Sequence, residues 1–152
     1  MNGHDEMTDA LRPLLGLFAR LAVDYRVGGS VASSVWGRAR STLDVDLVAD
    51  IHAEHVLPIC SALESDYYVS DAAMREALAR RTSFNLIHFD TMMKIDVFTL
   101  ASSPFDRASF ARFQTEEIGE LNQVRFCTAE DMILRKLDWY RQGGEVSTKQ
   151  WD

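Results

Sequence analysis

Residues 43–48 read Leu43-Asp44-Val45-Asp46-Leu47-Val48, so apolar and acidic residues alternate along this stretch. A period of two is the pattern of a β-strand with one polar and one apolar face. Asp44 and Asp46 therefore project to the same side of the strand, and their apolar neighbours project to the core. Like charges repel, and a divalent cation that prefers carboxylate oxygens would offset the repulsion. Taken alone, a solvated strand face explains the pair equally well.

Upstream of this stretch the sequence reads Val27-Gly28-Gly29-Ser30, where an apolar strand runs into two glycines, a serine and an expected helix. Glycine lets the backbone approach a phosphate closely, and a helix N-terminus offers free N–H groups and a partial positive charge. The segment is thus a candidate phosphate loop. An ordinary glycine turn is the competing interpretation.

Downstream, Asp96 is the one acidic residue in the otherwise apolar run Met93–Phe98, with Lys94 on the same expected face. If this strand lies beside the first one, Asp96 completes a cluster of three carboxylates. A surface pair between Lys94 and Asp96 is the simpler alternative.

The order of these parts is more specific than any one of them: Gly-Gly-Ser, a gap of thirteen residues, Asp-Val-Asp, then a later strand with a single Asp. It resembles the DNA polymerase β-like nucleotidyltransferase superfamily over roughly residues 25–100. The resemblance implies an α/β (α+β) fold, with a small mixed β-sheet flanked by helices. It also implies a two-metal mechanism that uses Mg²⁺ or Mn²⁺ and a nucleoside triphosphate (NTP) as substrate. The implied catalytic residues and metal ligands are Asp44, Asp46 and Asp96, and the implied phosphate-binding residues are Gly28, Gly29 and Ser30.

The C-terminal part, residues 130–140 followed by Gln150-Trp151-Asp152, is similar to the AbiEii-type branch of that superfamily. The likeness implies roles for Lys136 and Asp152, and it implies a possible antitoxin partner. We expect one nucleotidyltransferase-like domain over residues 1–152, whose C-terminal helical region is cut short.

Three basic residues are further candidates for nucleotide binding. Arg38 and Arg40 precede the acidic strand, and a guanidinium matches phosphate oxygens well. Lys136 would reach the triphosphate from its helix. Ordinary exposed surface positions are the alternative for all three.

Composition limits the class of protein. The chain has 152 residues and a formal net charge of -7, which argues against a protein that coats nucleic acid by charge alone. Two distant cysteines form no zinc or disulfide framework. The N-terminus does not read as a signal peptide, and no run is apolar enough to span a membrane, so we expect a cytoplasmic location. The four histidines are expected to be solvated.

Periodicity predicts the remaining elements. The expected helices are 8–23, 30–36, 52–63, 71–80, 104–113 and 128–140, and the expected strands are 25–27, 43–48, 67–69, 84–89, 93–100 and 124–126.

The sequence therefore favours a nucleotidyltransferase that moves a nucleoside monophosphate from an NTP to a hydroxyl. The acceptor is left open between an RNA end, a protein side chain and a small molecule, including an aminoglycoside-type antibiotic. The alternative is a non-catalytic module that binds a nucleotide or a partner, such as one half of a toxin–antitoxin pair.

Overall fold

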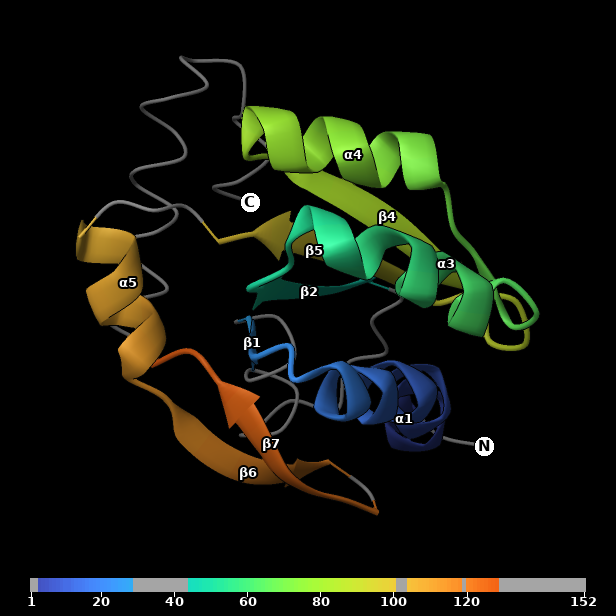
Figure 1. Ribbon diagram of the computed structural model, residues 1–152. Helices are drawn as coiled ribbons and strands as arrows, with labels where there is room; N and C mark the ends of the chain where they lie inside the picture. Colours follow the sequence, from blue (N-terminus) through green and yellow to red (C-terminus); the bar gives the residue numbers. More distant parts are fainter. Residues whose placement is uncertain (1–2, 29–43, 101–103, 119, 129–152) are drawn as a thin grey trace, which may run out of the picture.

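The computed structural model describes residues 3–28, 44–100, 104–118 and 120–128 (Figure 1). In this part of the chain, four α-helices, one 3₁₀ turn and seven strands form a mixed α/β fold. In chain order the elements are α1 (Gly3–Leu21), β1 (Tyr25–Val27), β2 (Asp44–Ala49), η1 (Ala53–His55), α3 (Val56–Leu63), β3 (Tyr67–Tyr68), α4 (Asp71–Arg80), β4 (Ser83–His88), β5 (Lys94–Thr99), α5 (Pro104–Ala111), β6 (Gln114–Ile118) and β7 (Leu121–Phe126).

The strands form one mixed sheet in the order β3-β4-β5-β2-β1-β7-β6. β2 pairs with β5 in parallel and with β1 antiparallel, so β2 lies at the centre of the sheet. The expected strands 84–89 and 93–100 are present as β4 and β5, which pair antiparallel in a hairpin closed by a turn in which Met92 is left-handed with φ 60°. The predicted sheet of mixed character is therefore confirmed.

One face of the sheet is covered by helices and holds the core. Along β2 and β5 the residues on this face are buried completely or nearly so, as are the helix residues that meet them. Tyr67 shows how the layers are joined, because its buried hydroxyl donates a hydrogen bond to the carbonyl of Ala10 in α1. None of the helices in the described segments is long and apolar enough to cross a bilayer.

The helices begin and end where their local chemistry changes. The Ser70 hydroxyl accepts a hydrogen bond from the Ala73 N–H at 3.1 Å, which caps the start of α4. The helix ends at Arg81, which is left-handed with φ 57°. The predicted bounds of α4 are the observed ones. The expected helix 30–36 lies outside the described residues, as does all of the expected helix 128–140 except Thr128.

Two expectations were wrong. Strand β6 was not predicted, since its sequence Gln-Thr-Glu-Glu-Ile lacks the alternation of a half-buried strand. It forms at the edge of the sheet by pairing with β7 and includes an irregularity between Glu116 and Ile118. His88 is also not solvated. It is 5% exposed and its Nδ1 lies 2.9 Å from the Thr91 hydroxyl.

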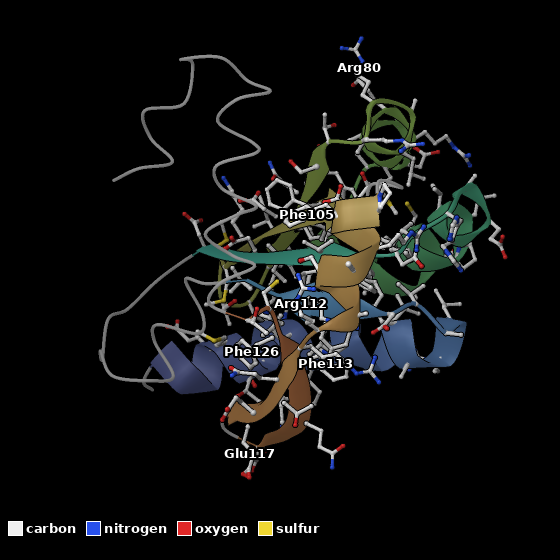
Figure 2. The ribbon with its side chains drawn as sticks, turned by 90° about the vertical axis from the view of Figure 1, so that its left-hand side faces the viewer. Arg80, Phe105, Arg112, Phe113, Glu117 and Phe126 are labelled. Atoms are coloured by element: carbon white, nitrogen blue, oxygen red, sulfur yellow. The ribbon has the colours of Figure 1, made fainter. Side chains whose placement is uncertain are left out.

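Helix α5 differs from the other helices in its position. Figure 2 shows it in front of the sheet, with Arg112 and Phe113 at its lower end and the β6–β7 hairpin beneath it. It is thereby separated from the layer formed by α1, α3 and α4 (Figure 1).

Candidate active site

The polar residues of β2 lie on the face of the sheet opposite the main helix layer. Val45 and Leu47 are 0% and 1% exposed in the core, and the alternation of the strand directs Asp44 and Asp46 to the other side. We call this side, as formed by β3, β4, β5 and β2, the open face. Both carboxylates therefore project to the same side of the sheet, as the sequence predicts.

Asp46 and Asp96 are neighbours across two parallel strands. They are Cα partners in the register of β2 and β5, and both belong to the open face. Burial raises the pKa of Asp96; Lys94 acts against this rise, and the negative charges of Asp44 and Asp46 add to it. The condition set out from the sequence, that the Asp96 strand lies beside the Asp44 strand, is therefore met.

Two further open-face residues adjoin the carboxylates. The Lys94 ammonium lies 4.0 Å from the Asp96 carboxylate, so the ion pair considered from sequence is present together with the acidic cluster. Asn85 on β4 is the register partner of Asp96 and is exposed. Sequence reasoning did not select Asn85, although it stands at a polar position of the predicted strand 84–89. Lys94 thus lies beside Asp96 along the same strand, and Asn85 lies beside it on the neighbouring strand.

Gly28 lies directly against Asp46. Its N–H donates a hydrogen bond to the Asp46 carbonyl at 2.7 Å. A Cβ at this position would stand 3.0 Å from an Asp46 carboxylate oxygen and 3.1 Å from the Asp46 carbonyl oxygen. These contacts are tighter than a Cβ normally makes, so any residue other than glycine would displace Asp46 by a few tenths of an ångström.

The donor chemistry suits a hard divalent cation. Carboxylate oxygens are the ligands that Mg²⁺ prefers, and the effect of Asp44 and Asp46 on the pKa of Asp96 reflects concentrated negative charge. Within the described residues, however, no three His, Cys, Asp or Glu side chains stand close enough together to hold an ion as they lie. The residues fit a metal by type and by strand register, and a shared metal site at Asp44, Asp46 and Asp96 stays a proposal.

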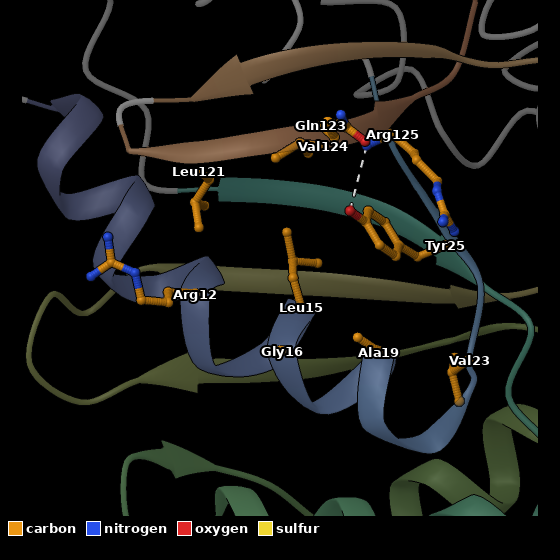
Figure 3. A pocket seen from close by; sticks show the side chains of 10 residues that line it. All are labelled: Arg12, Leu15, Gly16, Ala19, Val23, Tyr25, Leu121, Gln123, Val124 and Arg125. Carbon is orange, nitrogen blue, oxygen red and sulfur yellow. Dashed lines mark hydrogen bonds between the residues drawn. The ribbon is translucent and has the colours of Figure 1, made fainter.

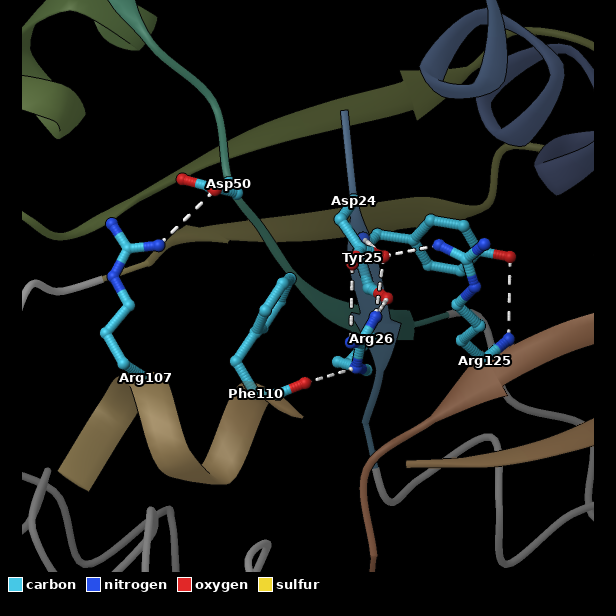
Figure 4. A network of polar contacts seen from close by, with 7 residues as sticks. All are labelled: Asp24, Tyr25, Arg26, Asp50, Arg107, Phe110 and Arg125. Atoms are coloured by element: carbon cyan, nitrogen blue, oxygen red, sulfur yellow. Dashed lines mark hydrogen bonds and ion pairs between the residues drawn. The ribbon is translucent and has the colours of Figure 1, made fainter. Parts of the chain in front are cut away.

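The opposite end of the open face is covered by α5 through a buried arginine. Arg26 on β1 is the register partner of Val48, and it is 3% exposed. Its Nε donates to the Phe110 carbonyl at 2.8 Å, and its guanidinium lies 4.1 Å and 4.2 Å from the ring centroids of Phe110 and Phe113 (Figure 4). Among the described residues, α5 packs over this end, and Asp44 at the other end of β2 is exposed.

Asp24 ties this arginine to β7. It accepts hydrogen bonds from Arg26, at 2.6 Å, and from Arg125 (Figure 4). Partial burial acts to raise the pKa of Asp24, but the hydrogen bonds and charges of the two arginines outweigh it and lower the pKa below its ordinary value. The cluster of Asp24, Arg26 and Arg125 stabilises the fold and does not touch the acidic residues of β2. The short segment Tyr25-Arg26-Val27 did not predict that Arg26 is buried.

A cavity of about 340 Å³ lies elsewhere, between α1, β1 and β7 (Figure 3). Tyr25 lines it, and the Tyr25 hydroxyl accepts a hydrogen bond from the Arg125 N–H at 3.4 Å. The cavity contains none of the predicted catalytic or nucleotide-binding residues.

Five of the predicted nucleotide-binding residues lie outside the described residues: Gly29, Ser30, Arg38, Arg40 and Lys136.

The fold is that of nucleotidyltransferase-like proteins, as comparison with solved structures shows. An antigenic nucleotidyltransferase-like protein from Paracoccidioides brasiliensis aligns with a TM-score of 0.58 at 21% identity, over 96% of this chain and 71% of that one. A candidate nucleotidyltransferase (TM1012) from Thermotoga maritima aligns with a TM-score of 0.53 at 14% identity, over 94% and 92%.

A third similar structure is the lincosamide antibiotic adenylyltransferase LnuA, solved with lincomycin bound. It aligns with a TM-score of 0.52 at 17% identity, over 82% of each chain. No protein-family model and no curated protein matches the chain. At these identities the likeness establishes the fold, and the AbiEii-type branch is not distinguished within it.

Proposed function

We propose that the chain is a nucleotidyltransferase that transfers a nucleoside monophosphate from an NTP to a hydroxyl acceptor. The observation that carries the proposal is the register pairing of Asp46 with Asp96, with Gly28 packed against Asp46. This acidic pair stands on the open face of a sheet whose fold is shared with nucleotidyltransferase-like proteins.

The transfer reaction has a defined balance of bonds. The acceptor hydroxyl oxygen attacks the α-phosphorus and forms a new P–O bond, while the bond from that phosphorus to the bridging oxygen breaks. The bridging oxygen leaves with the electron pair as pyrophosphate, and the hydroxyl proton passes to a base. Asp96 is the proposed residue to help deprotonate the acceptor hydroxyl, as the superfamily resemblance implies and as its place beside Asp46 on the neighbouring strand allows.

Asp44, Asp46 and Asp96 would hold divalent ions on this face. Bound Mg²⁺ or Mn²⁺ supplies charge stabilisation for the phosphoryl oxygens and the departing pyrophosphate. The chain's own carboxylates would fix the position of those ions, and Gly28 keeps Asp46 in place. Gly29, Ser30, Arg38, Arg40 and Lys136 are the proposed contacts of the triphosphate, on the basis of the sequence.

The acceptor class is supported by one neighbour. LnuA is an adenylyltransferase of a lincosamide antibiotic, so this fold serves transfer to a small molecule in at least one protein. For the present chain a small-molecule acceptor is accordingly proposed ahead of an RNA end or a protein side chain. An antitoxin partner remains a proposal from the sequence likeness alone.

The test is transfer from α-labelled NTPs with Mg²⁺, across all four nucleotides and a panel of small-molecule, RNA and protein acceptors. We expect label on an acceptor and pyrophosphate release, with both lost in Asp44→Asn and Asp46→Asn. Asp50→Asn is the matched control and should keep the activity. Asp50 directly follows β2, at the end opposite the acidic pair, and its carboxylate lies 3.4 Å from the Arg107 guanidinium (Figure 4). Nucleotide binding without turnover on the whole panel would instead support the non-catalytic module.

A further inference from the structure

The cavity between α1, β1 and β7 is separate from the proposed transferase site. Its volume of about 340 Å³ is within the range of pockets that bind small molecules. Ala19 on α1 and Gln123 on β7 line the cavity from opposite walls, and both residues are exposed, so the cavity opens to solvent. A small ligand can therefore enter it without any rearrangement of the core.

An irregularity in β7 shapes one wall of this cavity. Strands β6 and β7 pair at Ile118 and Leu121, and next at Glu116 and Val124. Over this interval β6 advances by two residues and β7 by three, so β7 carries one extra residue, as in a β-bulge. Gln123 lies in this stretch and is left-handed with φ 57°, a conformation that is costly for a residue other than glycine. The bulge bends β7 beside the cavity, so this wall is a built feature of the fold.

The lining has an apolar middle and a cation at each end. Figure 3 shows Arg12 at one end, Tyr25 and Arg125 at the other, and Leu15 and Leu121 between them. Among the described residues that line the cavity, the two arginines are the only charged ones, and no Asp or Glu is present. The lining is therefore complementary to a molecule with an apolar body and a negative charge.

The two arginines differ in how firmly their partners hold them. Arg125 pairs with Asp24, whose carboxylate also accepts a hydrogen bond from the buried Arg26. Arg12 pairs with Glu120 at 2.9 Å, and the two side chains are 50% and 85% exposed, so this ion pair contributes little to stability. The carboxylate of a ligand can therefore replace Glu120 as the partner of Arg12 at small cost.

We propose that this cavity binds a small carboxylate with an apolar body, outside the transferase site. The carboxylate pairs with Arg12 in place of Glu120. The apolar body lies between Leu15 and Leu121, and its far end meets the Tyr25 ring. Removal of apolar surface from water drives the binding, and the ion pair selects an anion over a neutral molecule or a cation.

Two-dimensional NMR of the protein tests this with octanoate, octanol, octylamine and acetate. We expect octanoate to shift the backbone amide signals of Ala19 and Tyr25 in a saturable way. Octanol should bind about two- to fivefold more weakly, which is the range of an exposed ion pair. Octylamine has the wrong charge and acetate lacks the apolar body, so both should bind more weakly than octanol. No saturable shift with octanoate, or octylamine that binds as tightly as octanoate, would overturn the proposal.

Three variants locate the site. Ala19→Leu fills the cavity from an exposed helix position and should weaken octanoate binding about tenfold or more, with thermal unfolding to show that the variant is folded. Ala62→Leu, at an exposed position of α3 outside the cavity, is the matched control and should leave the affinity unchanged. Arg12→Gln should weaken octanoate about two- to fivefold and leave octanol unchanged. Octanoate affinity that survives Ala19→Leu, or an equal effect of Arg12→Gln on octanoate and octanol, would contradict the assignment.

Discussion

Asp46 on β2 and Asp96 on β5 are Cα partners on adjacent parallel strands, with both carboxylates on the open face. Burial is the main reason that the pKa of Asp96 is raised, and the charge of Asp46 adds to it. This relationship joins two segments fifty residues apart in sequence into one acidic centre.

The first prediction concerns this coupling. In Asp46→Asn one repelling charge is removed, so the pKa of Asp96 should fall, while the effect of its burial remains. An NMR titration that follows the Asp96 carboxyl carbon, in the presence of a chelator, measures the change. An unchanged or higher pKa would show that the two carboxylates do not interact.

The second prediction concerns Gly28→Ala. The new Cβ would stand 3.0 Å from the Asp46 carboxylate and 3.1 Å from its carbonyl oxygen, so Asp46 must move. We expect kcat for nucleotidyl transfer to fall about ten- to a hundredfold, because small displacements of catalytic groups are costly. Thermal unfolding should show that the variant is folded.

Gly16→Ala in α1 is the control for this substitution. Its Cβ would meet only the end of the Arg20 side chain at 3.9 Å, an ordinary contact. Activity should be retained, and stability should rise by about 0.5–1 kcal/mol, as for alanine in place of glycine in a helix. Equal activity of the two alanine variants would contradict the role assigned to Gly28.

The third prediction concerns the buried Arg26. Replacing it by Met removes the hydrogen bonds to Asp24 and Phe110 and the guanidinium that packs on two rings. We expect the free energy of unfolding to fall by about 1–3 kcal/mol, as measured by urea denaturation, because the buried Phe110 carbonyl loses its donor, while the 42% exposed Asp24 side chain keeps its pair with Arg125. By contrast, Arg12→Ala breaks an exposed pair with Glu120 and should cost below about 1 kcal/mol. Similar losses in both variants would contradict the account of Arg26.

The fourth prediction concerns pH. The pKa of Asp24 is lower in the folded protein than its ordinary value of 3.8, so its ionised form stabilises the fold. This contribution is fully present above pH 3.8 and is lost as the pH falls through the lowered folded value. Asp24→Asn should therefore destabilise the protein most near neutral pH, and the difference from wild type should shrink below about pH 4. Unfolding curves at several pH values check this, and a difference that grows with acidity would have the wrong sign.

Much of the fold was predictable because its strands are amphipathic. The alternation around Val45 and Leu47 and the run Met93–Leu100 indicated two strands, which are observed as β2 and as β5 over Lys94–Thr99. For α4 the helical composition and a capping residue at its start predicted the observed bounds, and the Ser70 side chain caps the helix. The two carboxylate strands were thus located correctly from local pattern alone.

The rest depends on contacts that local sequence does not encode. β6 is polar, and it becomes a strand only because β7 offers a free edge. Arg26 appears as an ordinary charged residue until α5 packs over it. Asn85 adjoins Asp96 through strand order, since β4 lies beyond β5 in the sheet. Strand order is a long-range property, so these residues could not be assigned to the site from spacing.

The most direct test of the central claim is a crystal structure with Mn²⁺ and a non-hydrolysable NTP, read from the anomalous scattering of the metal. The account predicts an ion bound by Asp46 and Asp96, with Asp44 as a further ligand and the triphosphate beside Gly28. An ion and nucleotide bound away from these carboxylates, for example in the cavity lined by Tyr25, would contradict it.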